Sequence, residues 1–141
     1  MALSHRPILL TFLFALAGNT TWEMAQMYAY SGLPSSTSAM ALSCGIAAIG
    51  DAIYITVLYV LGRKITGEHN WTSRLHWRRL FAAVGTSVIA AVVLESVSQR
   101  LGVWQYSERM PIIPALGVGL WPVLQLPVLT VVVFVMVGRI V

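Results

Sequence analysis

The sequence predicts an all-α membrane protein, a single bundle of four transmembrane helices. Three observations predict this fold class. Hydrophobic residues make up 57% of the 141 residues and charged residues only 10%, whereas soluble domains carry about 25% charged residues. The mean hydropathy is +0.77. Four mostly apolar stretches each reach the roughly 20 residues that cross a bilayer.

The composition argues against several other classes. A soluble fold of this length could not bury so much apolar surface, which excludes a soluble enzyme and a nucleic-acid-binding domain. Cys44 is the only cysteine, so no disulfide can form within the chain and a secreted disulfide scaffold is excluded. The net charge of +4 needs no nucleic-acid partner, because membrane proteins concentrate basic residues in their cytoplasmic loops.

The first span is expected at residues 7–30. His5-Arg6, the following apolar run and Ala15-Leu16-Ala17 imitate a signal peptide with its cleavage site. The apolar run continues past Ala17, so we expect this segment to be retained as a transmembrane helix.

Each of the other three spans follows a segment with loop character. Segment 31–35 is a turn cluster with glycine and proline. Segment 63–79 is polar and basic, and segment 102–114 is rich in proline, glycine and aromatic residues. The predicted spans are therefore residues 36–62, 80–101 and 115–138.

The distribution of Lys and Arg predicts the orientation. In a four-span arrangement seven basic residues fall on one side of the membrane and two on the other. The side with seven, which also carries both termini, is expected to be cytoplasmic. We expect a multi-pass protein of the bacterial inner (plasma) membrane. The seven are Arg6, Arg63, Lys64, Arg74, Arg78, Arg79 and Arg139, and the two are Arg100 and Arg109.

Segment 63–79 and the methionines are weaker functional signals. In segment 63–79 tryptophans alternate with arginines, which fits either a lipid-headgroup or partner site or an ordinary interfacial anchor. We favour the anchor. Met24 with Met27, or Met40 with Cys44, offer soft metal ligands, but methionine is also a common core residue. We expect no metal site and no cofactor.

Three acidic residues lie inside the predicted spans: Glu23, Asp51 and Glu95. A charge at bilayer depth costs at least about 2.5–3.5 kcal/mol on insertion scales. Each acid should therefore face the interior of the bundle and either have a partner there or bind a proton.

Helical spacing places further polar residues on the same faces as the acids. Residue counting puts Glu23, Glu95 and Gln125 at similar depth in the outer half of the membrane and Asp51 somewhat deeper. The sequence therefore predicts one chamber that four helices share. The faces are Asn19, Glu23, Gln26 and Tyr30; Cys44, Ala47, Asp51 and Tyr54; Ala91, Glu95, Ser98 and Gln99; and Gly117, Trp121 and Gln125.

Segment 102–114 is a candidate lid for this chamber. An aromatic turn containing Trp104 and Tyr106 precedes an extended stretch that Pro111 and Pro114 stiffen. The same aromatic residues, with Trp121, also suit a membrane-interface belt, and both interpretations stay open. The acids have an alternative too, because each could be protonated, hydrogen-bonded to a neighbouring amide and chemically inert.

The motifs resemble two groups of membrane proteins. The first is an uncharacterised family of small four-span bacterial inner-membrane proteins, and the likeness covers most of the chain. A looser resemblance is to intramembrane isoprenoid enzymes, namely carotenoid hydratases, small lycopene cyclase subunits and terpene cyclases, which also have a membrane Glu followed by a Gly-x-Trp-x-Tyr-like turn and proline. The Pro-Glu-Glu type motif of the lycopene cyclases is absent. The matching residues are Trp22-Glu23-x-x-Gln26, Gly50-Asp51, Glu95, Gly102-x-Trp104-x-Tyr106, Met110-Pro111-x-x-Pro114 and Gly117-x-Gly119-x-x-x-Pro122-x-x-Gln125.

These features lead to a functional hypothesis and two alternatives. The hypothesis is acid–base chemistry on an apolar, isoprenoid- or quinone-like lipid, with Glu95 as the acid and Asp51 or Glu23 as the base. The alternatives are an accessory subunit of a membrane complex and a proton-coupled transporter of small solutes. Either a homo-oligomer or a larger membrane complex is compatible with so few helices. The expected substrate-binding residues are Asn19, Trp22, Gln26, Tyr54, Gln99, Trp104, Tyr106, Trp121 and Gln125.

Overall fold

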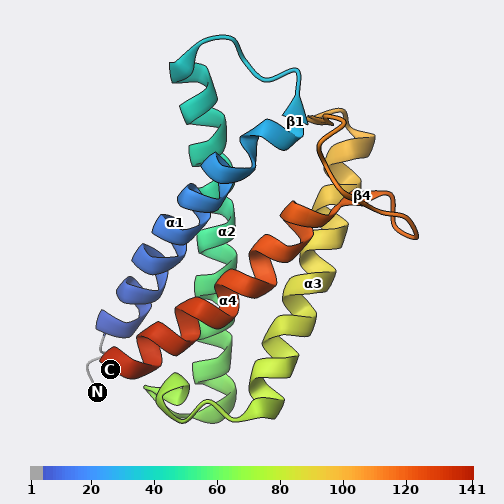
Figure 1. Cartoon of the computed structure of the whole chain (residues 1–141). Helices are drawn as coiled ribbons and strands as arrows, with labels where there is room; N and C mark the ends of the chain where they lie inside the picture. The colour runs from blue at the N-terminus through green and yellow to red at the C-terminus, as the bar shows by residue number, and fades with distance from the viewer. Residues whose placement is uncertain (1–4) are drawn as a thin grey trace.

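The computed structural model describes residues 5–141 and contains four long helices (Figure 1). All four are long and apolar enough to cross a membrane, which confirms the predicted all-α four-helix membrane bundle. They are α1 (Arg6–Gln26), α2 (Thr37–Thr66), α3 (Trp77–Arg100) and α4 (Leu120–Ile140).

Helix boundaries differ from the predicted spans where caps and prolines fix them. α2 runs on to Thr66 and stops at Gly67, whose φ of 70° is the left-handed conformation that glycine supplies at helix ends. α4 begins at Leu120, five residues later than predicted. Its first turn accommodates Pro122, because the N–H groups of a first turn have no helical acceptor.

The two ends of the bundle have different structures. One end, which we call the η2 end, holds the start of α1, the end of α4 and the short helix η2 (Trp71–Arg74) between α2 and α3 (Figure 1). The other, the strand end, holds the connections between α1 and α2 and between α3 and α4. The seven basic residues counted above lie at the η2 end, while Arg100 and Arg109 lie at the strand end.

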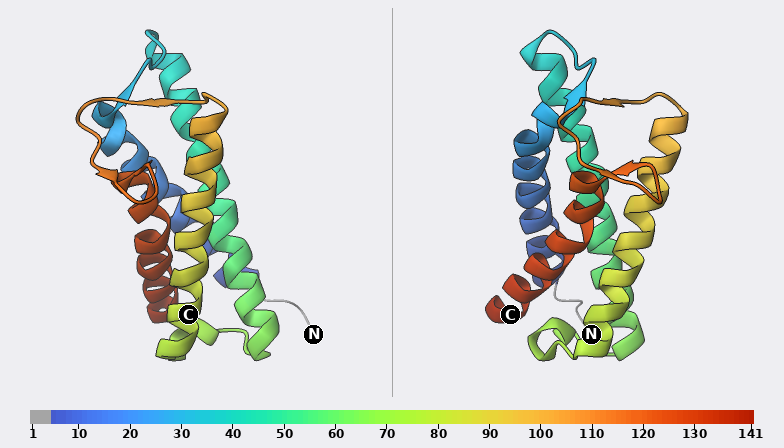
Figure 2. Two further views of the ribbon diagram at one scale, coloured as in Figure 1. Left: turned by 90° about the vertical axis from the view of Figure 1, so that its right-hand side faces the viewer. Right: turned by 45° about the vertical axis from the view of Figure 1, so that its right-hand side comes forward.

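Four two-residue strands tie the strand end together. β1 (Tyr30–Ser31), which follows the short helix η1 (Met27–Ala29), pairs antiparallel with β2 (Gln105–Tyr106), so Tyr30 lies opposite Tyr106. β3 (Ile112–Ile113) pairs with β4 (Val118–Gly119). Figure 2 shows the segment between α3 and α4 reaching across to the end of α1. Residues 115–119, predicted to be helical, form the turn and strand of the second pair.

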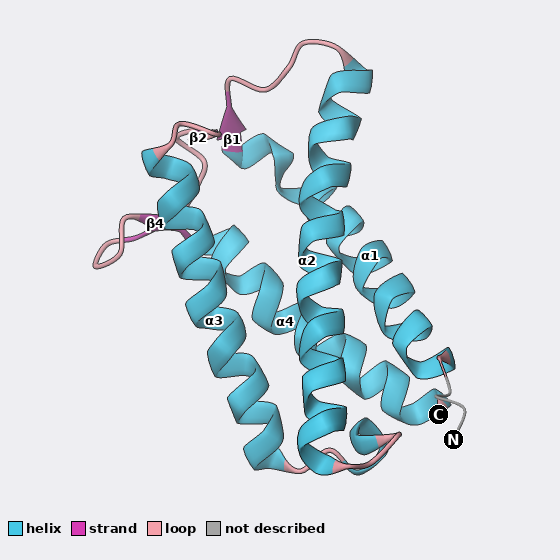
Figure 3. Cartoon of the chain, turned by 180° about the vertical axis from the view of Figure 1, so that it is seen from behind, coloured by secondary structure: helices cyan, strands magenta, loops and turns pink. Residues whose placement is uncertain are grey.

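α4 lies at the centre of the helix packing. α1 packs against both α2 and α4, and α3 packs against α4; seen from behind, α4 is visible between α2 and α3 (Figure 3). α3 buries one stripe of residues at four-residue spacing. Three of the four side chains in it are small, which lets α3 approach α4 closely. This stripe consists of Ala83, Ser87, Ala91 and Glu95, and the Ser87 and Thr130 hydroxyls are hydrogen-bonded at 3.0 Å.

The η2 end is closed by an aromatic core. The Trp71 ring lies 5.9 Å from the Tyr59 ring and 5.2 Å from the Phe134 ring, and its indole N–H donates to the Tyr59 carbonyl at 3.0 Å. Gly62 faces the Trp71 ring, and Gly138 faces the Thr72 backbone, so a side chain at either glycine would collide.

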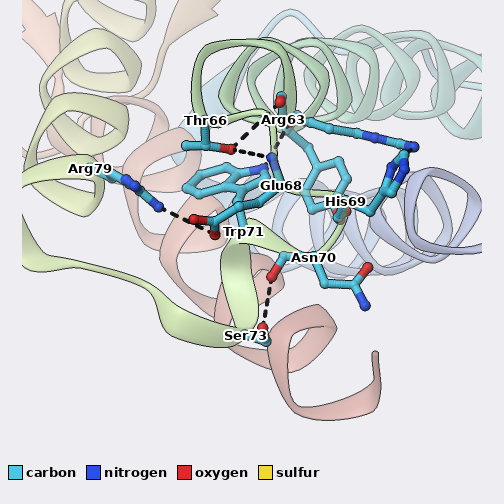
Figure 4. Close-up of polar contacts among 9 residues, drawn as sticks. Arg63, Thr66, Glu68, His69, Asn70, Trp71, Ser73 and Arg79 are labelled. Atoms are coloured by element: carbon cyan, nitrogen blue, oxygen red, sulfur yellow. Dashed lines mark hydrogen bonds and ion pairs between the residues drawn. The ribbon is translucent and has the colours of Figure 1, made fainter.

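Polar contacts fix the chain around this core (Figure 4). Arg63, 7% exposed, is hydrogen-bonded to His69, and Arg79 forms an ion pair with Glu68 at 3.7 Å. The Asn70 side chain donates to the carbonyl of Val141 at 3.0 Å. The segment between α2 and α3 is therefore an ordered cap on the helix ends.

Candidate functional site

A cavity of about 690 Å³ lies at the strand end among all four helices. This volume is within the range of sites that bind small molecules. Most of its lining is apolar, but its polar side chains come from every helix and from β1. The polar side chains on it are Glu23, Tyr30, Ser31, Ser43, Asp51, Tyr54, Glu95, Ser98 and Gln125.

The three membrane acids meet at this cavity. Glu23 comes from the last turns of α1, Asp51 from the middle of α2 and Glu95 from the last turns of α3. α2 and α3 contribute through faces of helical periodicity, because Cys44, Ala47, Asp51 and Tyr54 all line the cavity, as do Ala91, Glu95 and Ser98.

The side-chain amide of Gln125 is the centre of the polar network. Gln125 is 2% exposed, and its Nε2 lies 2.9 Å from Asn19 Oδ1 and 3.0 Å from both Glu23 Oε1 and Asp51 Oδ2. An amide NH2 has only two hydrogens, so the three acceptors compete for them. The two carboxylate oxygens share one nitrogen and are thus at most about 6 Å apart, a separation at which charges interact strongly.

The network continues away from the cavity through α1. Gln26 Nε2 donates to Gln125 Oε1 at 3.0 Å, and the Trp22 indole N–H donates to Gln26 Oε1 at 3.2 Å. Asn19, which is fully buried, donates from Nδ2 to the Ala15 carbonyl at 2.8 Å. These bonds fix the positions of the amides behind the carboxylates.

Glu95 has a separate set of partners. The Trp104 indole N–H, at 3.3 Å, and the Tyr106 hydroxyl both donate to Glu95 Oε2. The Tyr106 oxygen in turn accepts from the Gly119 N–H at 2.9 Å. Among residues 5–141 no hydrogen bond ends on Glu95 Oε1, so that oxygen is left for the cavity.

An aromatic group covers the site at the strand end. The Tyr30 ring lies 6.4 Å from Trp104 in an edge-to-face arrangement and 5.8 Å from Tyr106. Burial, followed by the carboxylate of Glu95, raises the pKa of Tyr30. Burial and the hydrogen bond to Glu95 likewise raise the pKa of Tyr106. Both hydroxyls are therefore protonated over a wide pH range, and that of Tyr106 is a donor to Glu95.

The sequence-predicted site residues divide into three groups. Glu23, Asp51, Tyr54, Glu95, Trp104 and Gln125 line the cavity. Asn19, Gln26, Gln99 and Tyr106 stand behind it; Gln99 donates to the Trp104 carbonyl at 3.3 Å. The remaining two, Trp22 and Trp121, lie elsewhere.

Trp22 and Trp121 line a second hollow of about 620 Å³ between α1 and α4, together with Gln26 and Tyr28. They line this hollow and not the carboxylate cavity, although the sequence analysis placed both among the expected substrate-binding residues. Neighbouring helical residues point about 100° apart, so Trp22 turns away when Glu23 faces the cavity. The Trp121 N–H is buried and has no hydrogen-bond partner among the residues described here.

Part of the enclosure of the cavity has no signal in the sequence. Tyr30 was on the same predicted face as Glu23, but its role in covering Glu95 depends on the β1–β2 pairing, for which no sequence pattern exists. Segment 31–34 and Met27 also close the cavity. Within residues 5–141, no group of three or more His, Cys, Asp or Glu is arranged to hold a metal ion.

No protein-family model, no curated protein and no solved structure matches the chain.

Proposed function

We propose that this protein is an intramembrane enzyme that performs acid–base chemistry on an apolar lipid of isoprenoid or quinone type. The observation that carries the proposal is the convergence of three carboxyl groups from three helices on one largely apolar cavity. The resemblance of the sequence motifs to those of intramembrane isoprenoid enzymes, together with the largely apolar cavity, suggests the substrate class.

The position of the cavity suits a substrate that arrives from the bilayer. Ile46 on α2 and Leu94 on α3 line the cavity and are also 63% and 53% exposed on the bundle surface. The cavity therefore borders the apolar outer faces of both helices, and a lipid can enter between α2 and α3 without crossing water.

The proposed reaction begins at Glu95. A proton on Oε1 passes to an alkene carbon of the lipid and leaves a carbocation, while Trp104 and Tyr106 stabilise the new carboxylate by their bonds to Oε2. The Trp104 and Tyr30 rings are available to stabilise the cation. Glu23 or Asp51 then removes a proton from a neighbouring carbon, which gives an isomerised alkene without net oxidation or reduction. Return of this proton to Glu95 restores both groups for the next turnover.

Deuterium exchange tests this proposal without knowledge of the product. The protein in lipid nanodiscs is incubated in D2O with prenyl alkenes and prenyl quinones, and the lipids are analysed by mass spectrometry. Reversible proton transfer should place deuterium on carbon. Glu95→Gln should reduce the exchange by about 100-fold or more, whereas Trp77→Phe, at an exposed ring remote from the cavity, should not. Exchange that persists fully in Glu95→Gln contradicts the assignment.

The alternative of a transporter finds less support than the enzyme. Beyond the cavity toward the η2 end, Ala52, Ile55, Tyr59 and Phe134 are fully buried, so close and mostly apolar packing separates the cavity from that end. An accessory subunit would instead co-purify with a larger complex and show no exchange in D2O.

We also propose that the protein resides in the bacterial inner membrane with the η2 end in the cytoplasm. The support is the excess of seven basic residues over two at that end. Cysteine labelling at exposed positions of the two ends in intact cells tests this orientation.

A further inference from the structure

The amide relay behind the carboxylates has a direction, and one end of it favours that direction. The relay runs from Trp22 to Gln26 to Gln125, with bonds of 3.2 and 3.0 Å, and ends on Asn19, Glu23 and Asp51. Gln26 is 4% exposed and Gln125 2% exposed. Reversing either amide inside the protein would therefore leave buried polar atoms without partners.

The indole N–H of Trp22 can only donate a hydrogen bond. It therefore requires the oxygen of Gln26 on its side, which leaves the Gln26 NH2 group for Gln125. Gln125 must then present its oxygen to Gln26 and its NH2 group to the carboxylates. The donor-only indole at one end thus favours one orientation of two amides in succession. At the other end, Asn19 donates from Nδ2 to the Ala15 carbonyl and presents Oδ1 to the same Gln125 NH2 group.

The carboxylates enforce the same orientation only while they are ionised. An ionised carboxylate accepts the Gln125 N–H, but a carboxyl group that has taken up a proton can also donate to an amide oxygen. The member of the pair that holds the proton would then tolerate Gln125 in either orientation. In the reversed orientation the Gln125 oxygen would accept the new proton and hold it in place.

We infer that Trp22 is a positioning residue that keeps the Gln125 NH2 group directed at the Glu23–Asp51 pair after this pair has accepted a proton. It acts through Gln26 and lies outside the carboxylate cavity. The inference deepens the proposed function and rests on it for its effect on turnover. Keeping the amide fixed prevents it from trapping the proton, so the pair passes the proton back to Glu95 and returns to its accepting state.

The titratable groups near the pair come from several elements. Cys44 and Tyr54 on α2, Glu95 on α3 and Tyr30 on β1 line the same cavity. α4 presents the uncharged Gln125, and α1 adds Asn19 and Gln26. Comparisons between variants at equal pH keep these contributions the same.

NMR spectroscopy of protein labelled with ¹⁵N-glutamine tests the orientation directly. The chain has four glutamines, and Gln125→Leu identifies the signal of Gln125. In the parent protein this side-chain amide signal should remain single as the pH is lowered from about 8 to about 4, into the ordinary range of carboxyl titration. In Trp22→Phe it should split or shift to a second position.

The second hollow supplies a matched control. Trp121 lines it as Trp22 does, but the Trp121 N–H bonds to nothing in residues 5–141. Trp121→Phe should therefore keep the parent signal. If Trp22→Phe behaves like the parent, or if both variants split the signal alike, the inference is wrong. Should Trp22→Phe not fold, Gln26→Met interrupts the same relay at its next bond and should give the same second signal.

The deuterium-exchange assay separates this inference from the proposed function. Trp22→Phe should slow exchange into the lipid by about 10-fold to 100-fold, the range for misplaced catalytic groups, with little change in the lipid concentration at half-maximal rate. Trp77→Phe should exchange at the parent rate. A split amide signal without any lipid exchange in the parent supports the relay and contradicts the enzyme.

Discussion

The two ends of the bundle are built from the same four helices but differ in their interiors, which are aromatic at one end and contain carboxyl groups at the other. At the η2 end Trp71, Tyr59 and Phe134 form a solid aromatic core, and two glycines allow backbone to touch ring and carbonyl. At the strand end the helices enclose a cavity of about 690 Å³ that holds three carboxyl groups. We conclude that the packing at the η2 end stabilises the fold, whereas the buried polar groups at the strand end lower its stability.

The largest effect on stability should come from the aromatic core. Trp71→Ala removes a ring that is 2% exposed and its bond to the Tyr59 carbonyl, so the free energy of unfolding should fall by about 3–5 kcal/mol. Denaturant titration in detergent, followed by circular dichroism, measures the loss. Trp77→Ala, at a ring that is 59% exposed, should cost much less. Equal losses in the two variants would contradict the stabilising role of this end.

A smaller loss in the free energy of unfolding should follow from adding a side chain at Gly138, where the end of α4 contacts the Thr72 backbone. The methyl group of Gly138→Ala would collide with the Thr72 carbonyl, and overpacking of this kind costs about 1–3 kcal/mol. Gly85→Ala is the matched change in α3, where nothing lies within 4 Å of the new methyl group. That variant should be as stable as the parent or slightly more so, since alanine favours helix. The same denaturant titration compares them.

The strand end should lose stability at alkaline pH. Burial first, and then Glu95, raises the pKa of Tyr30, and burial raises that of Tyr106. Folding therefore favours their neutral forms. This stability is complete below the ordinary tyrosine pKa of about 10 and is lost as the pH rises above it, by at most about 1.4 kcal/mol per pH unit for each tyrosine.

Tyrosinate absorbance, recorded with circular dichroism during an alkaline titration, measures this effect. Among the five tyrosines, Tyr30 and Tyr106 should ionise only as the strand end opens. The double variant Tyr30→Phe with Tyr106→Phe should therefore weaken the dependence of stability on alkaline pH. If all five tyrosines ionise together in the folded protein, the covered aromatic group at the strand end is not intact in solution.

The smallest effect on stability is expected at the carboxylate pair. Asp51→Asn removes one of two carboxylates that share the Gln125 amide, and removing a charge from a crowded buried site is often neutral or stabilising. The free energy of unfolding should stay within about 1 kcal/mol of the parent or rise. A loss comparable to that of Trp71→Ala would mean that the pair holds the fold together and that the contrast between the ends is wrong.

Hydropathy and helical periodicity were sufficient to predict most of the architecture. The four helices follow from apolar length, and the meeting of Glu23, Asp51 and Glu95 follows from the cost of exposing acids to lipid. Periodicity also predicted the faces of α2 and α3 well. These signals are strong because each rests on many residues or on a large free energy.

The rest depends on contacts too short or too specific to leave a pattern. Two-residue strands such as β1 and β2 have no periodicity, so their pairing could not be predicted. The late start of α4 follows from a turn at Gly117, whose φ is 67°. Gln125 was expected on the chamber wall, but its donation to both Glu23 and Asp51 depends on the direction of one amide.

The pairing of β1 with β2 has a consequence for the order of assembly during translation. Tyr30 leaves the ribosome 76 residues before its partner Tyr106. α1 and α2 therefore enter the membrane before α3, α4 and the segment between them are present to complete the cavity. A nascent chain halted before α3 would expose Glu23 and Asp51 to lipid. Insertion of the last helical hairpin therefore completes the pocket and shields its acids in the same event.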